Sequence, residues 1–209
     1  MRKEKLAQRK KQIRLAAYTL LAEKGYKNTS MLAIAKKAKA SNETLYKWYG
    51  SKQKLFKTLI EENSLEIRRR LEEAIDGQWS VSKTLDEAGA LLLSLVVSEK
   101  AIVLNRAAAA DAQETAILGL TLAEAGRNAV VPLMNQMFEQ AKRDGELIFS
   151  DKDRVTETYI HLLIGDLQIR RVIGALGPLS QGEIDTRVTY ANILFLKLFA
   201  QPRKDTCSQ

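Results

Sequence analysis

The chain has 209 residues, of which 45% are hydrophobic and 28% charged, so it is long enough for one large domain or two. This composition is typical of an ordinary globular protein and excludes a low-complexity chain. Residues 1–50 contain 13 Lys or Arg and 3 Asp or Glu, whereas the rest of the chain contains 20 and 22. The basic first quarter therefore predicts a phosphate-facing surface in that part of the chain.

Cysteine content and hydropathy predict the compartment. Cys207 is the only cysteine, which excludes a disulfide framework and a cysteine-based metal site and suits a reducing cytoplasm. The opening MRKEKLAQRKK has no apolar stretch of the kind that a signal peptide needs. The longest apolar run, residues 90–97, is far shorter than the roughly 20 residues that span a bilayer. We therefore expect a cytoplasmic protein with no membrane partner.

The first predicted helix covers residues 12–23. Its apolar residues have the i, i+3, i+4, i+7 spacing of an amphipathic helix: Ile13, Ala16, Ala17, Leu20 and Leu21. Gly25 is expected to end this helix in the left-handed conformation. The basic run over residues 2–11 that precedes it would, taken alone, be a solvated chain end.

Residues 29–49 predict two short helices joined by a tight turn. N-cap residues precede both helices, Thr29 and Ser30 the first and Ser41 the second. Ala35 is small, as is required where two helices cross closely near a right angle. This pattern is that of a helix-turn-helix, which places its second helix in the major groove of DNA.

The segment SNETLYKWY at residues 41–49, followed by Ser51, Lys52, Leu55 and Phe56, resembles the DNA-binding domain of TetR-family transcriptional regulators. The resemblance rests on the Thr-Leu-Tyr triplet, the aromatic pair and the Ser-Lys before the next helix. It implies an all-α fold with an N-terminal three-helix helix-turn-helix domain and a larger helical domain for ligand binding and dimerisation. It further implies a double-stranded DNA operator, a second copy of the chain and a small-molecule effector as partners.

The residues expected to contact DNA lie in or beside the second helix of this unit. They are Thr29, Ser30, Lys39, Asn42, Glu43, Thr44, Tyr46, Lys47, Trp48 and Lys52. Backbone N–H groups at helix N-termini favour a phosphate. The resemblance implies DNA-backbone contacts by Tyr46, Trp48 and Lys52. Directly before this unit, the basic residues 2–11 are expected to form a non-specific phosphate arm.

Three residues depart from the family pattern. Lys39 stands where the family usually has glycine in the turn, and a left-handed non-glycine residue costs about 1 kcal/mol. Glu43 replaces a small residue, and Trp48 replaces the usual tyrosine. Glu43 either accepts a hydrogen bond from the N4 amino group of cytosine or only stabilises the first turn of its helix. Lys47 likewise contacts DNA or is a solvated surface charge.

A fourth helix is predicted from residue 52 to about residue 76, with Ser51 as its N-cap. Its later part is heavily charged, which indicates a surface helix. The small core beneath the helix-turn-helix is expected to contain Tyr26, Leu32, Ile34, Leu45 and Phe56. The predicted division is residues 1–50 for DNA binding, 51–77 as a linking helix and 78–209 for effector binding and dimerisation.

The remaining sequence is predicted to be helical throughout. Helices are expected over residues 82–97 and 99–112, in a pair broken at Gly126, and over residues 153–176 and 183–200. Residues 103–171, which include GDLQIRRVIG, resemble the ligand-binding domain of the AefR-like branch of the family. The predicted fold class is all-α with two domains.

No catalytic constellation is present, because His161 is the only histidine and no glycine-rich phosphate loop occurs. We therefore expect no enzyme activity, no metal and no cofactor. Candidate effector-pocket residues are polar side chains in apolar segments and a Met/Phe stripe: Asn105, Arg106, Met134, Met137, Phe138, His161 and Asp166. The alternative is that the histidine is a hydrogen-bonded core residue and the stripe is ordinary core.

The last two predicted helices carry more apolar residues than one small domain buries, so we expect them to pair with a second copy in a four-helix bundle. The expected interface residues are Tyr159, Leu163, Leu167, Ile173, Val188, Phe195 and Phe199. The predicted function is a sequence-specific regulator, a repressor released from a palindromic operator by a small, largely apolar ligand. The alternatives are an architectural DNA-binding protein without an effector and, less compatible with the helix-turn-helix, a basic membrane-surface anchor.

Overall fold

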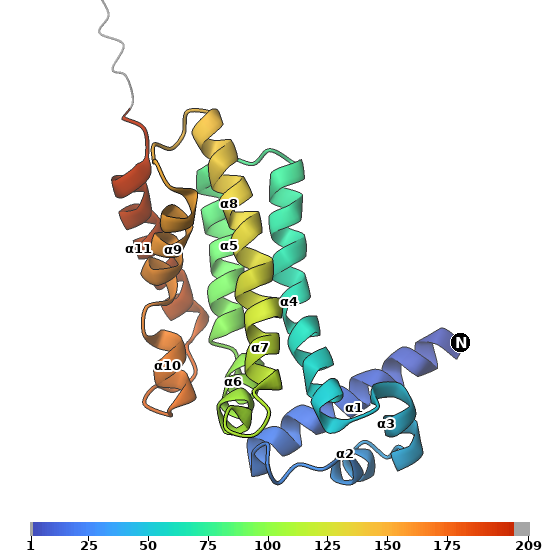
Figure 1. Ribbon diagram of the computed structural model, residues 1–209. Helices are drawn as coiled ribbons and strands as arrows, with labels where there is room; N and C mark the ends of the chain where they lie inside the picture. The colour runs from blue at the N-terminus through green and yellow to red at the C-terminus, as the bar shows by residue number, and fades with distance from the viewer. Residues whose placement is uncertain (1, 203–209) are drawn as a thin grey trace, which may run out of the picture.

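The computed structural model describes residues 2–202, with side chains from residue 4 onward, and this part of the chain is helical apart from its connecting turns (Figure 1). The elements are α1 (Arg2–Lys24), α2 (Met31–Lys37), α3 (Asn42–Tyr49), α4 (Lys52–Asp76), α5 (Val81–Val96), α6 (Glu99–Asp111), α7 (Ile117–Leu122), a π turn (Ala123–Arg127), α8 (Asn128–Arg143), α9 (Lys152–Ile164), α10 (Leu167–Val172) and α11 (Gln181–Phe199). Helices α1 to α3 form a unit at one end, from which α4 rises into the larger bundle (Figure 1). The all-α fold is confirmed. Within residues 2–202 no helix has the length and apolar character needed to cross a membrane.

The first hydrophobic core lies under α1, α2, α3 and the start of α4. Its fully buried residues include Ile13, Ile34, Leu45, Leu55 and Phe56. The expectation that Leu32 belongs to this core is wrong, because its side chain is 65% exposed. The buried face of the short α2 consists of Met31, Ile34 and Ala35, and Leu32 lies on the other side.

Helix α1 begins ten residues earlier than the apolar pattern predicts. Residues 2–11 contain no glycine or proline and are mostly good helix formers, so nothing in the sequence stops the helix there. Gly25 ends it in the left-handed conformation, with φ of 72°. The basic run is therefore an exposed helical extension and not an irregular arm.

Helix α4 contributes to both hydrophobic cores. Leu59 and Ile60 lie in the first core, and Ile67 and Leu71 lie in the second. Ser64, between these pairs, is also buried and donates its hydroxyl to the carbonyl of Glu61 at 3.0 Å. The later part of α4 is thus a surface helix, as predicted, with one face charged and exposed and the other face buried in the second core.

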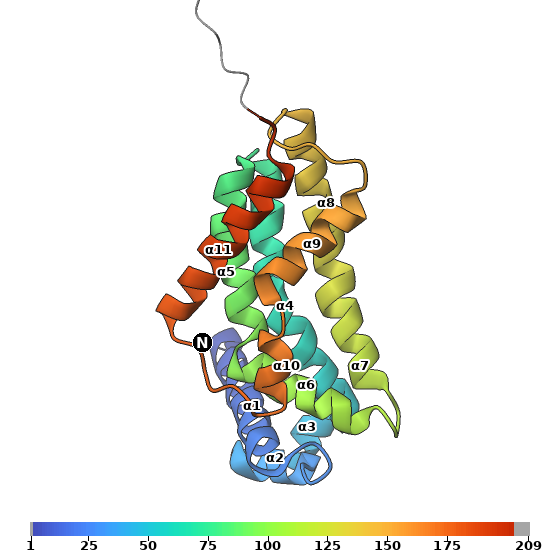
Figure 2. The same ribbon diagram turned by 90° about the vertical axis from the view of Figure 1, so that its left-hand side faces the viewer.

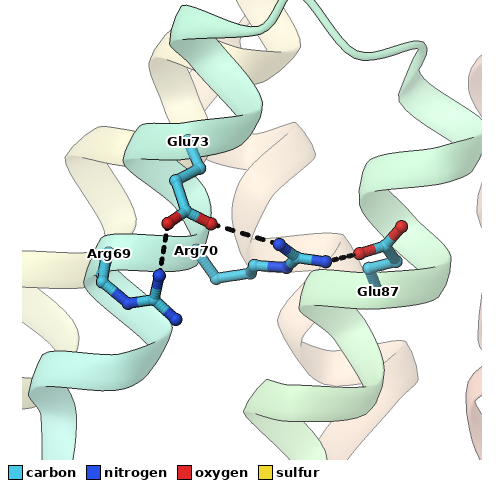
Figure 3. A network of polar contacts seen from close by, with 4 residues as sticks. All are labelled: Arg69, Arg70, Glu73 and Glu87. Carbon is cyan, nitrogen blue, oxygen red and sulfur yellow. Dashed lines mark hydrogen bonds and ion pairs between the residues drawn. The ribbon is translucent and has the colours of Figure 1, made fainter.

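An ion-pair network joins α4 to α5 near the far end of α4 (Figure 3). Arg70 lies between the carboxylates of Glu73, at 3.1 Å, and Glu87 on α5. Arg69 pairs with the other oxygen of Glu73. Arg70 also stacks over the ring of Trp79, with its guanidinium carbon 4.6 Å from the ring centroid. The charged face of α4 is thereby used to fix α5 beside it.

The second core is built around three aromatic rings on α8, α9 and α11. The centroids of Phe138 and Phe195 are 5.0 Å apart, and Tyr159 contacts both rings edge-on. The Tyr159 hydroxyl lies 3.2 Å from the carbonyl of Leu85 on α5 and 3.0 Å from Oδ1 of Asn192 on α11. One side chain thus connects three helices of the bundle.

Two helix interruptions differ from the sequence prediction. The helix expected over residues 153–176 ends at Ile164, because Gly165 takes φ of 51°, and a short α10 follows. The break expected at Gly126 is instead a π turn, through which α7 continues into α8 without a loop. The second part of that pair begins at Asn128.

We expect Gly89→Ala to destabilise the protein by about 1–3 kcal/mol, the usual range for overpacking a tight core. A methyl group on this residue of α5 would come within 2.2 Å of the Tyr159 hydroxyl oxygen. The free energy of unfolding in urea, measured for the variant and the wild type, checks this.

Gly119→Ala is the matched control, because the added methyl group meets no atom within 4 Å on exposed α7. It should leave stability unchanged or raise it by up to about 1 kcal/mol, since alanine is the better helix former. Equal unfolding free energies for Gly89→Ala and the wild type would contradict the close approach of α5 to Tyr159.

Candidate DNA-binding surface and internal cavity

The helix-turn-helix is held by caps and by its turn. Ser30 accepts a hydrogen bond from the backbone N–H of Ala33 at 3.1 Å, and Ser41 accepts one from Thr44 at 3.0 Å. Lys39 in the turn takes φ of 52°, the left-handed conformation that was expected there. Its carbonyl accepts a hydrogen bond from the Arg9 guanidinium at 2.9 Å, so α1 also braces the turn.

The outer face of α3 presents polar and basic side chains. Asn42, Glu43, Tyr46 and Lys47 are exposed, and Thr44 and Trp48 are half-buried beside them. Leu45 and Tyr49 form the inner face and fix the helix on the first core. The geometry brings the predicted residues of α3 to one surface, while their contacts with DNA stay predictions.

Basic residues extend this surface along α1. Lys5, Arg9, Lys10 and Lys11 are all exposed on its first three turns. A row of cations on one end of the molecule attracts the phosphate backbone regardless of sequence.

Two of the predicted contact residues face the protein interior. The Lys52 ammonium donates to the carbonyl of Tyr26 at 2.5 Å and lies 3.9 Å from the centroid of the Tyr26 ring. Burial lowers the pKa of Lys52 below its usual value. Thr29 is 1% exposed and donates its hydroxyl to the carbonyl of Gly25 at 2.8 Å. The Thr29 hydroxyl is buried away from a phosphate, and the half-buried Lys52 ammonium binds a backbone carbonyl, so both side chains position the chain entering α2 and α4.

The DNA-binding unit is packed directly on the second domain. Leu104 on α6 and Leu118 on α7 are buried in the first core together with residues of α1. Lys27 pairs with Glu114 in the α6–α7 connection at 3.0 Å. Tyr26 lies at this junction with its hydroxyl buried and unpaired among the described residues, and burial raises its pKa to about 12. The unit therefore contacts the second domain through α6 and α7 as well as through α4.

A partly open cavity of about 320 Å³ lies between α4, α5, α6, the end of α7, the π turn, α8, α9 and α10. Apolar side chains form most of its wall, and the polar ones are Asn63, Ser64, Asn105, Arg127 and Gln168. Its volume is at the lower end of the range of roughly 300–1,000 Å³ for small-molecule pockets.

Most of the predicted pocket residues do not line this cavity. Asn105 does. The Arg106 guanidinium instead donates to the carbonyls of Val172, at 2.7 Å, and Arg171, at 3.0 Å, which ties α6 to the end of α10. His161 and Asp166 are exposed on the molecular surface.

The Met/Phe stripe on α8 belongs to the second core, which was the alternative interpretation. Met134, Met137 and Phe138 are at most 6% exposed. Sequence reasoning missed Asn63, Gln168 and the π turn as cavity residues. In the sequence, Asn63 and Gln168 occupy positions like those of ordinary polar surface residues on an amphipathic helix. No local signal therefore distinguishes them from such surface residues.

Four of the seven predicted interface residues are buried inside the chain. Tyr159, Leu163, Val188 and Phe195 are at most 5% exposed and fill the second core, so they cannot reach a second copy. Leu167 and Phe199 are partly buried, and only Ile173 is well exposed.

The exposed apolar side chains on this side of the molecule are different ones. They are Ile169 and Ile173 on α10, and Tyr190, Ile193 and Leu198 on α11. Figure 2 turns the face with α9, α10 and α11 toward the viewer. Because α11 has apolar residues on two faces, helical spacing alone does not tell the inner face from the outer one.

Two family models match the chain. The model of bacterial regulatory proteins of the tetR family matches residues 13–59, and the model of the C-terminal domain of AefR-like transcriptional repressors matches residues 83–201. No curated protein gives a significant match.

Several solved structures share the fold. A putative TetR-family transcriptional regulator from Mesorhizobium loti has a TM-score of 0.78 and 21% identity, covering 93% of this chain and 98% of its own. The flavonoid-responsive regulator FrrA has a TM-score of 0.68 and 27% identity, covering 94% of this chain and 99% of its own. The SmeT–triclosan complex has a TM-score of 0.75 and 17% identity, covering 93% of each chain.

Proposed function

Because the chain belongs to the TetR family, whose members are DNA-binding transcription regulators and not enzymes, we propose that it is a repressor released from a palindromic operator by a small ligand. The observation that carries this proposal is the combination of the exposed polar face of α3 with a cavity whose wall includes α4. A dimer would present two such helices about 34–36 Å apart, one turn of DNA, and so would match a palindrome.

Ligand release follows from the shared position of α4. Ile60 and Ile67 line the cavity, and Ile60 also packs in the first core beneath α3. A ligand that fits better when α4 is displaced would favour a conformation with a different spacing of the two recognition helices. To shift the operator from nearly fully occupied to nearly empty, the ligand must prefer that conformation over the DNA-binding one by roughly 5.5 kcal/mol.

The neighbouring structures support a ligand of this general kind. One is titled as flavonoid-responsive and another is a complex with triclosan. For this chain, the mostly apolar cavity wall supports a small, largely apolar effector.

Glu43 is the residue of α3 that we propose to set base preference. It is exposed near the N-terminal end of the helix, where its carboxylate could accept a hydrogen bond from cytosine N4. Lys47, Tyr46 and Asn42 on the same face are the proposed partners for phosphates and other base edges.

The test of this function is to sequence the genomic DNA fragments that the protein retains at physiological salt. We expect an enriched palindrome with half-sites one helical turn apart. Retention of fragments with no common sequence would instead support an architectural DNA-binding protein.

Lys47→Ala should weaken binding to all sequences alike and flatten the salt dependence by about 0.9 units of log K per log[salt] for each lost phosphate contact. Lys52→Ala should leave that slope unchanged and lower the stability of the first core, because the Lys52 ammonium binds Tyr26. Lys152→Ala, at the start of α9, removes the same charge from the other domain and is the control. Binding isotherms over a salt series measure all three, and a Lys47→Ala slope equal to that of the control would contradict the phosphate contact.

We propose that the chain is a homodimer through the exposed apolar side chains of α10 and α11. Ile193→Asp is expected to give a monomer with weaker operator binding, because it places a charge in this face, where Ile193 is 48% exposed. Leu120→Asp, on an apolar residue of α7 that is 63% exposed, is the control and should stay dimeric. Sedimentation at micromolar concentration measures this, and a monomeric wild type would contradict it.

A further inference from the structure

The cavity wall contains the side-chain amides of Asn105 and Gln168. Asn105 donates its amide N–H to the carbonyl of Ala101 at 2.9 Å, and Gln168 donates its own to the carbonyl of Val96 at 3.3 Å. These bonds fix the orientation of both amides and leave their oxygens free. Within residues 2–202 neither oxygen has a hydrogen-bond partner. Both residues line the cavity, so its wall contains two amides that each have an unpaired acceptor oxygen.

A third amide lies on α4. Asn63 lines the cavity and makes no hydrogen bond within the described part of the chain. An amide in a largely apolar wall gains free energy when a partner satisfies it. A ligand that bonds Asn63 would act on α4 directly, close to Ser64, where the buried face passes from one core to the other.

The wall offers no counter-charge for an ionised ligand. Of the described residues that line the cavity, only Arg127 carries a charge. Its side chain is 56% exposed and pairs with Glu157 at 3.1 Å. No carboxylate lines the cavity to receive an amine. Burying an unpaired ion costs far more than burying a hydroxyl that finds an acceptor.

We propose that the effector is an uncharged, mostly apolar molecule with a hydroxyl group that donates its one proton to the amide oxygen of Asn105, the amide with the shorter orienting bond. This inference rests on the proposed ligand-released function and specifies the chemistry of its ligand. The apolar body of the molecule lies against Leu92, Val130 and Ile160, and Asn63 bonds whatever further polar group it carries.

Three probes with one skeleton test the chemistry: 4-pentylphenol, its methyl ether 4-pentylanisole and the carboxylate 4-pentylbenzoate. A phenol has a pKa near 10, so it is uncharged at pH 7. Titration calorimetry with the full-length protein should give an affinity for the phenol that is about threefold to tenfold higher than for the ether, the effect of one hydrogen bond. The carboxylate should bind more weakly than either.

Asn105→Leu replaces the acceptor by an apolar side chain of the same branching and should reduce the phenol's affinity to that of the ether. Gln168→Met removes the second acceptor and should lower the phenol's affinity by less than Asn105→Leu does. Asn28→Leu is the matched control, because Asn28 also donates its amide to the carbonyl four residues earlier, at 3.1 Å, but lies outside the cavity. The affinity for the ether should be the same in all of these proteins.

Equal affinity of the wild type for phenol and ether, or no binding of any probe, would overturn the proposal. The proposal would also be overturned if the carboxylate bound more tightly than the other two probes and if Arg127→Gln abolished that binding. Operator release is measured separately with the same probes on the selected DNA. Preferential phenol binding without release of DNA would leave the ligand chemistry standing and refute the ligand-released repressor.

Discussion

Helix α4 gives its buried face to two hydrophobic cores in succession, and both parts of the molecule depend on this arrangement. Ile60 packs beneath the helix-turn-helix, and Ile67, about two turns later, packs within the larger bundle. A division that treats residues 51–77 as a separate link therefore does not describe the packing. Since both isoleucines also line the cavity, a displacement of the DNA-binding unit that moves α4 changes the shape of the cavity. Under the proposed function, ligand affinity and DNA affinity would then be linked reciprocally.

The parts that the sequence predicts well depend on residues close together in the chain. Ser30, Ser41 and Ser51 cap the helices that follow them, as their positions suggest. The left-handed Lys39 was expected because it stands where the family pattern has glycine in the turn. These features are set by hydrogen bonds and sterics over three or four residues, so neighbours in sequence are enough to determine them. The exposed face of α3 was predictable for the same reason, since Leu45 and Tyr49 identify its inner face.

The sequence predicted poorly which residues are buried on a helix that has apolar residues on two faces, because the sequence does not show which face packs inward. Helix α11 is apolar on both, and only tertiary packing assigns Phe195 to the core and Ile193 to the surface. The same problem affected Leu32 on the short α2. The cavity was missed because it is the space left between seven helices and the π turn, and no single segment of the sequence encodes it. Lys52 was assigned to phosphate from the resemblance and from its place at a helix N-terminus, and its carbonyl partner, Tyr26, is too far away in the sequence to be recognised there.

The contact between Gly89 and Tyr159 has a mechanical consequence. Through one hydroxyl, Tyr159 holds α5, α9 and α11 together, and the absent side chain of Gly89 allows this close approach. Under the proposed ligand-released function, a ligand in the cavity would therefore displace α4, α6 or the π turn more readily than these three helices. In the proposed symmetric dimer, both DNA-binding units would then move relative to the same base. The distance between the two recognition helices would change by twice the outward travel of either one, so a small displacement in each protomer would count twice in the fit to the operator.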